Sequence, residues 1–130
     1  MTANARTLLL VGTLLAFTAV ALGAFGGHAL QAMVTPERLD TWQTAVRYQM
    51  FHAISILMLG LLIQQVPSLK LTSAAWCLAS GTLAFSGSLY LLVLSDIGLL
   101  GALTPLGGIL FLIGWALLGW QLLKHSVDQP

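Results

Sequence analysis

The sequence contains very little charge. Only 7% of its residues are Asp, Glu, Lys or Arg, and 58% are hydrophobic, whereas soluble domains carry about 25% charged residues. The net charge is +1 and no basic run is present, which excludes an extended surface for nucleic acid. We therefore expect an integral membrane protein that contacts the lipid bilayer and has no nucleic-acid partner.

Cysteine is almost absent as well. Cys77 is the single cysteine, so an intramolecular disulfide and a cysteine metal cluster are both excluded. Alternating polar and apolar residues of the kind found in strands are also missing. A chain in lipid must pair its backbone polar groups internally. Helices are therefore the only spanning elements that the sequence allows.

What the sequence has instead is four long apolar runs. A spanning helix needs about 20 apolar residues, and the chain has room for four such helices joined by short loops. We predict an all-α membrane protein, an antiparallel four-transmembrane-helix bundle that forms a single integral membrane domain over residues 1–130. The helices are expected at about 7–32, 36–65, 71–95 and 104–124.

The second helix has the clearest start. Thr35 can cap it and Pro36 suits its first turn. From 36 to 65 it would be about 45 Å long at 1.5 Å per residue, which exceeds a hydrocarbon core of about 30 Å. Its first nine residues are therefore expected to project from the membrane or to lie along its surface, unless the helix bends and restarts at Asp40-Thr41.

Basic residues divide unevenly between the two ends of the predicted bundle. Arg6, Lys70 and Lys124 lie at the end that holds the termini, whereas Arg38 and Arg47 lie at the opposite end. Cytoplasmic ends of membrane proteins carry more lysine and arginine. We therefore expect both termini in the cytoplasm.

Polar residues gather in the half of the bundle away from the termini, here called the outer half. In an antiparallel bundle, the second halves of helices one and three lie level with the first halves of helices two and four. Polar groups are costly in lipid and face one another or a wet cavity, so a polar pocket or a hydrogen-bonded core is predicted there. The candidate polar cluster comprises His28, Arg47, Tyr48, Gln49, His52, Ser86, Ser88, Tyr90 and Thr104.

Arg47 is the most demanding member of this cluster because a guanidinium does not lose its proton in a protein. Its side chain has two options. It can extend to the membrane surface, as long basic side chains do, or it can meet acceptors inside the bundle. The nearest acidic candidates are Asp40 and Asp96.

The histidines and serines offer little for catalysis or for a cofactor. Haem ligation by His28 and His52 would join side chains that differ in depth by about 8 Å, and two histidines without an intramembrane carboxylate are too few for a metal site. A nucleophilic Ser86 or Ser88 beside His52 would need a third group to orient the histidine. We expect no catalytic residue, no metal, no cofactor and no enzymatic activity.

Several stretches resemble the YgdD-like family of small inner-membrane proteins, a family of unknown function with a small eukaryotic transmembrane relative. They are residues 23–30 (GAFGGHAL), 42–53 (WQTAVRYQMFHA), 85–90 (FSGSLY) and 104–108 (TPLGG). The resemblance implies a four-helix, multi-pass protein of the bacterial cytoplasmic (inner) membrane and supplies no established activity. Phe51 departs from the family pattern, which often has tyrosine there.

These observations favour a multi-pass inner-membrane protein of unknown function. Its polar cluster would either lock the helices together or bind a small ligand or a partner, and a homo-oligomer or another membrane protein remains open as the partner. The alternative is a small transporter or channel, which ranks second because the half near the termini offers only Thr13, Thr18, Ser80 and Gly60 to line a polar path.

Overall fold

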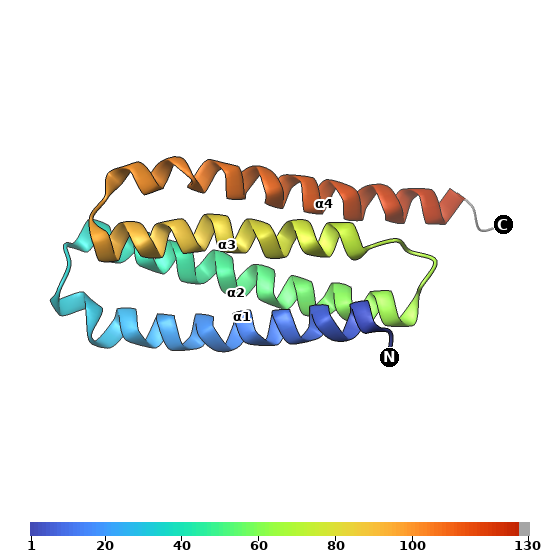
Figure 1. The fold of residues 1–130 in the computed structure, drawn as a ribbon, viewed down its shortest axis with the longest axis horizontal. Helices are drawn as coiled ribbons and strands as arrows, with labels where there is room; N and C mark the ends of the chain where they lie inside the picture. The colour runs from blue at the N-terminus through green and yellow to red at the C-terminus, as the bar shows by residue number, and fades with distance from the viewer. Residues whose placement is uncertain (128–130) are drawn as a thin grey trace.

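In the computed structural model, four long helices run alternately in opposite directions (Figure 1). The structure describes residues 1–127. Both termini lie at one end, called the termini end, and the loops that join the first to the second helix and the third to the fourth lie at the outer end (Figure 1). The elements are α1 (Ala3–His28), η1 (Leu30–Ala32), α2 (Pro36–Gln65), α3 (Thr72–Ser95), η2 (Gly98–Ala102) and α4 (Thr104–Val127).

All four helices are long and apolar enough to cross a membrane, so the predicted all-α antiparallel fold is confirmed. The second helix has the predicted bounds and continues through Asp40-Thr41 without a restart. The first helix was predicted at 7–32 and instead begins at Ala3 and ends at His28. It begins earlier because Thr2 caps it, and it ends earlier because the next residues form the separate turn η1.

Short-range polar contacts set where the helices begin and end. The Thr35 hydroxyl accepts a hydrogen bond from the Arg38 backbone N–H at 3.3 Å, and Pro36 occupies the first turn of α2. At the end of α3, Asp96 adopts a left-handed conformation with φ of 56°, which aspartate tolerates better than most residues. Arg38 donates to Asp96 Oδ1 from Nε at 3.0 Å and from Nη2 at 2.6 Å, so this ion pair fastens the start of α2 to the end of α3.

The helices form an open row rather than a closed ring. Each helix packs along the next one in the chain, and α1 also touches α3. Within the described residues, no Cα atom of α4 lies within 8 Å of one in α1 or α2. α2 and α3 are therefore the inner helices. Of the other three long helices, only α3 has its backbone close to α4, and α4 reaches α2 through the side chains of Phe111 and Trp115, which contact His52. A space between α2 and α4 follows from this arrangement.

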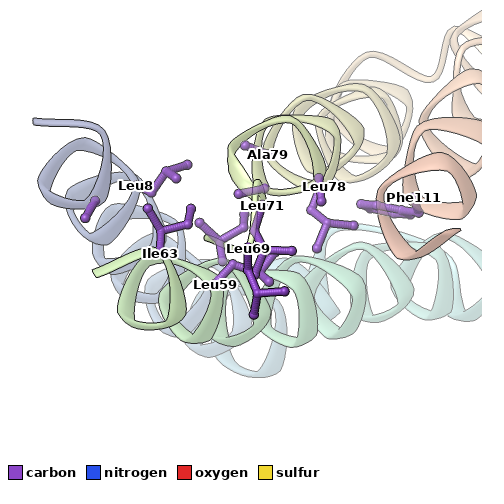
Figure 2. Packing of buried hydrophobic residues seen from close by; sticks show 12 residues of the cluster. Leu8, Leu59, Ile63, Leu69, Leu71, Leu78, Ala79 and Phe111 are labelled. Carbon is purple, nitrogen blue, oxygen red and sulfur yellow. The ribbon is translucent and has the colours of Figure 1, made fainter. Parts of the chain in front are cut away.

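The main hydrophobic core joins all four helices towards the termini end (Figure 2). Leu8 of α1 and Ile63 of α2 meet at one side of it, and Phe111 of α4 extends towards Leu78 of α3 at the other (Figure 2). Apolar packing in this half agrees with its scarcity of polar residues. The buried members are Ala5, Leu8, Ile56, Leu59, Ile63, Leu69, Leu71, Ala74, Ala75, Leu78, Ala79 and Phe111.

Glycines allow α4 to lie directly on α3. A Cβ atom added at Gly107 would stand 2.4 Å from the backbone nitrogen of Phe85, and one added at Gly81 would stand 2.7 Å from Cδ1 of Phe111. The neighbouring Gly108 faces the other way, where a Cβ would meet nothing within 4 Å. Two adjacent glycines therefore have opposite surroundings.

This contrast predicts opposite effects for the same substitution. Gly107→Ala should lower the free energy of unfolding by about 1–3 kcal/mol because α3 backbone must move away. Gly108→Ala should leave it unchanged or raise it by up to about 1 kcal/mol, since alanine is the better helix former. Unfolding of the purified variants by denaturing detergent in mixed micelles measures both, and equal stability of the two variants would contradict the α3–α4 contact described here.

Candidate functional site

The polar residues of the outer half separate into two groups that lie on opposite sides of α2. One group is a buried network that links α1, α2 and α3. The other lines a groove between α2 and α4. Neighbouring residues of α2 serve different groups, because successive side chains on a helix point about 100° apart.

Gln49 is the centre of the buried network and is only 4% exposed. Its Nε2 donates to the Leu15 backbone oxygen at 2.9 Å and to Thr18 Oγ1 at 2.8 Å. Its Oε1 accepts a hydrogen bond from the Tyr90 hydroxyl at 2.7 Å. One side-chain amide thus joins three helices, with partners for both its nitrogen and its oxygen.

Two further bonds extend the same pattern. Trp42 Nε1 donates to the Leu22 backbone oxygen at 2.8 Å, and Ser86 Oγ donates to the Ala45 backbone oxygen at 2.7 Å. The Trp42 ring also packs against Tyr90, with 4.6 Å between the ring centres. In each case a polar side chain of one helix binds a backbone carbonyl of its neighbour, so the network fixes both the spacing and the rotation of the helices.

A separate polar contact joins α3 to α4. Ser88 Oγ and Thr104 Oγ1 share a hydrogen bond at 2.7 Å. Throughout the part of the chain that the structure describes, no buried side-chain nitrogen or oxygen lacks a hydrogen-bond partner. The network and this contact are therefore fully satisfied, which is what a stabilising polar core in lipid requires.

His52 stands between the network and the groove with both ring nitrogens engaged. Nδ1 lies 2.8 Å from the Tyr48 backbone oxygen and must donate, because a carbonyl carries no hydrogen. Nε2 accepts from Trp115 Nε1 at 3.3 Å. These contacts select a neutral imidazole with its hydrogen on Nδ1. The ring lies flat on Phe111, with 3.6 Å between centres and 5° between planes, so its position is closely fixed.

The groove runs along α2 and α4 beside this histidine and has a volume of about 540 Å³. That volume falls within the range of small-molecule sites in proteins, about 300–1,000 Å³. Tyr48 stacks on Phe85 of α3 with 4.4 Å between ring centres, and both rings line the groove. The lining consists of Arg47, Tyr48, Phe51, His52, Phe85, Gly108, Phe111, Leu112 and Trp115.

Among the described residues that line the groove, Arg47 is the charged one, and it lies at the outer end. Its side chain is 70% exposed, and Nη2 lies 3.9 Å from Asp40 Oδ1. Nε donates to the Gln43 backbone oxygen at 3.4 Å. Both partners precede Arg47 in α2, so the side chain extends towards the membrane surface rather than into the bundle. A loose, exposed pair of this kind holds its cation weakly, which leaves the guanidinium able to bind an anion.

The structure brings together most of the residues predicted for the polar cluster, in two places. Gln49, Ser86 and Tyr90 belong to the network, and Ser88 contacts Thr104 close by. Arg47, Tyr48 and His52 line the groove. His28 is exposed at the last residue of α1, and none of the hydrogen bonds or ring contacts found in residues 1–127 joins it to either group.

Some residues of the site were not predicted from the sequence. Thr18 is a correction, because its bond to Gln49 places it in the network rather than in the apolar termini half. Trp42 was not among the predicted residues, yet it is buried and hydrogen-bonded to α1. Phe111 and Trp115 line the groove, and their i,i+4 spacing was the available signal, since it places two rings on one helix face.

We next considered whether the described residues around the groove could hold a metal ion. Within residues 1–127, no three His, Cys, Asp or Glu side chains gather where they could hold a metal ion. His52 has its Nε2 lone pair occupied by Trp115, so a ligand that binds the groove would meet ring faces and the indole rather than a free imidazole nitrogen.

The network predicts a measurable energetic coupling. Gln49→Leu should lower the free energy of unfolding by about 1–3 kcal/mol, because it removes the amide's bonds to α1 and leaves the partly buried Tyr90 hydroxyl without its partner. Tyr90→Phe should cost about 0.6–1.7 kcal/mol in the native background, as interhelical hydrogen bonds in membranes do, and almost nothing after Gln49→Leu. Gln43→Leu, at an exposed position of the same helix, is the control. Additive losses for the pair would contradict a direct Gln49–Tyr90 bond.

Comparison with known proteins places the chain in a family. The profile of the family described as "Protein of unknown function (DUF423)" matches residues 22–108. A UPF0382 membrane protein of Staphylococcus aureus is 42% identical, over 87% of this chain and 92% of that protein, and the UPF0382 membrane protein YwdK of Bacillus subtilis is 38% identical, over 92% and 98%. No solved structure matches the chain. The chain therefore belongs to the DUF423 family of membrane proteins, whose function is unknown.

Proposed function

We propose that this protein is a non-enzymatic, multi-pass protein of the bacterial cytoplasmic membrane that binds a single-chain anionic lipid in the groove between α2 and α4. The observation that carries the proposal is the groove itself, with an exposed cation at its outer end and aromatic rings along its walls. The buried Gln49 network would act as the frame that holds the groove in shape.

The dimensions of the groove suit one chain better than a double-chain lipid. On α4 the lining extends from Gly108 to Trp115, which is about 10 Å at 1.5 Å per residue. Phe51 and Leu112 are exposed side chains at its rim and offer apolar contact along that length. A chain of roughly eight carbons would lie extended against these residues, and the rest of a longer chain would remain in the bilayer.

Arg47 selects the head group. A guanidinium presents a planar set of N–H donors that matches a carboxylate or a phosphate. The contacts that compete for it are long, 3.9 Å to Asp40 Oδ1 and 3.4 Å to the Gln43 backbone oxygen. Because the side chain extends towards the membrane surface, it would hold the anion at the depth where lipid head groups lie. The ligand would therefore keep its normal orientation in the bilayer.

The hydrogen bonds of the serines and of His52 support a binding role over catalysis. Ser86 donates to the Ala45 backbone oxygen, and Ser88 pairs with the Phe85 backbone oxygen and with Thr104. His52 is engaged by Tyr48 and Trp115. Neither serine is paired with the histidine, so a nucleophile and its base are not assembled.

Location and orientation belong to the same proposal. Bacterial relatives named as membrane proteins support the cytoplasmic membrane, and Arg6, Lys70 and Lys124 at the termini end support cytoplasmic termini. On the basis of the sequence motifs, we also propose that the protein is related to the YgdD-like proteins and to their eukaryotic relative. Transport ranks second, because the core between the groove and the termini end consists of apolar side chains.

A photoreactive fatty acid tests the proposal. The purified protein in a mild detergent is labelled with a diazirine-bearing fatty acid, and the labelled residues are identified by mass spectrometry. Labels should fall on α2 and α4 within the groove. Gly108→Leu should reduce labelling at least fivefold, because its side chain enters the groove, where the structure leaves open space. Gly119→Leu is the matched control, since Gly119 lies on the same helix with equally open surroundings.

A comparison of an acid with an alcohol tests whether Arg47 binds the head group. Arg47→Gln should weaken labelling by the fatty acid at least fivefold and leave labelling by the corresponding fatty alcohol unchanged, because only the acid carries the anion. Equal labelling of the Gly108 and Gly119 variants would overturn the groove as the site. Cross-links between two copies of the chain across α2 and α4 would show instead that a second copy covers it.

A further inference from the structure

A second hollow lies at the termini end, far from the groove. It forms between the loop that joins α2 to α3 and the last turns of α4, which lie at the same end of the molecule (Figure 1). Its volume is about 250 Å³, and every side chain that lines it is polar or basic. The lining residues are Ser68, Lys70, Gln121, Lys124 and His125.

The charge of this hollow is one-sided. Lys70 and Lys124 contribute two ammonium groups, and neither forms an ion pair with any residue of the described chain. The acidic residues within residues 1–127 are Glu37, Asp40 and Asp96, all of which belong to the outer end. Asp128 lies outside the described residues. The two lysines thus create a positive potential at a surface where the rest of the described chain provides no counter-charge.

The neutral groups of the hollow add hydrogen-bond donors. Ser68 carries a hydroxyl, Gln121 an amide, and His125 a ring nitrogen that can donate. Gln121 and His125 are four residues apart in α4 and share a face. Two cations with several donors form the combination that binds the oxygens of a phosphate.

The position relative to the membrane identifies the source of the phosphate. The hollow lies at the ends of helices that cross the bilayer, at the level of lipid head groups. Trp120 precedes Lys124 by four residues and is 66% exposed, so an apolar ring continues the same face of α4 towards the bilayer interior. Tryptophan at such positions occupies the interface between head groups and chains.

We propose that this hollow binds the phosphate of an anionic phospholipid, with Lys70 and Lys124 as the charged contacts and with the lipid chains descending past Trp120. The inference is independent of the ligand of the α2–α4 groove. It assigns a second lipid contact to the opposite leaflet. A head group bound there would connect the α2–α3 loop to the last turns of α4.

Native mass spectrometry of the full-length protein, with added phosphatidylglycerol or phosphatidylcholine, tests this site. Phosphatidylglycerol should bind at least tenfold more tightly. Lys70→Gln and Lys124→Gln should each weaken its binding about fivefold, the contribution of one basic residue near an anionic surface. Arg6→Gln removes the same charge from the termini end outside the hollow and should change binding less than twofold. Lys124→Arg should retain it.

Three outcomes would overturn the proposal. The first is equal binding of the two lipids. The second is a loss in Arg6→Gln as large as in the lysine variants, which would show attraction by the whole surface rather than by the hollow. The third is binding of inorganic phosphate that displaces phosphatidylglycerol at equal concentration, which would identify a site for the free anion. Both lysines are exposed, and the thermal stability of each variant in detergent confirms that its fold is intact.

Discussion

The structure depends on the rule that a polar side chain inside a membrane must find its partner within the protein. Gln49 meets this rule with one amide that binds a carbonyl and a hydroxyl of α1 and a hydroxyl of α3. A hydrogen bond of this kind holds two helices at a defined angle. An apolar contact between helices does so less, because lipid chains can replace it at little cost. The rotation of α2 is therefore set by Gln49, and every other side chain of α2 takes its direction from that choice.

The groove follows from this rotation. With Gln49 and Trp42 directed to α1 and Ser86 of α3 bound to the α2 backbone, the first three helices form a compact unit. The fourth helix is attached to α3 by close glycine contacts at Gly81 and Gly107. Its backbone does not come close to that of α2, and the two helices meet only through side chains such as Trp115 and His52. The side chains of α2 that face away from the network therefore border the groove. Aromatic rings fill part of the space between them and the backbone of α4.

The sequence was sufficient to predict four helices and the depth of most of the polar residues, because helix direction alternates and depth follows from residue number; Thr18 is the exception. It did not predict which side of α2 each polar residue serves. Tyr48 and Gln49 are adjacent in the chain and belong to different groups, and only the positions of α1 and α4 decide which is buried. Phe111 and Trp115 were missed for the same reason. Their spacing shows that they share one face of α4, but whether that face borders a groove depends on how α4 packs against α3.

The polarity of the groove is graded because most of the polar groups in its walls already have partners. The Trp115 indole N–H donates to His52, and His52 is bonded to Tyr48 and stacked on Phe111. These rings therefore present their faces to the groove rather than free hydrogen-bond donors. Arg47 is the exception, since it is exposed and weakly paired. A molecule in the groove would meet a cation at the membrane surface and apolar faces below it, which is the order of polarity in a bilayer leaflet. A lipid could therefore enter sideways without removing its head group from water, and such an exchange requires no opening of the helix bundle.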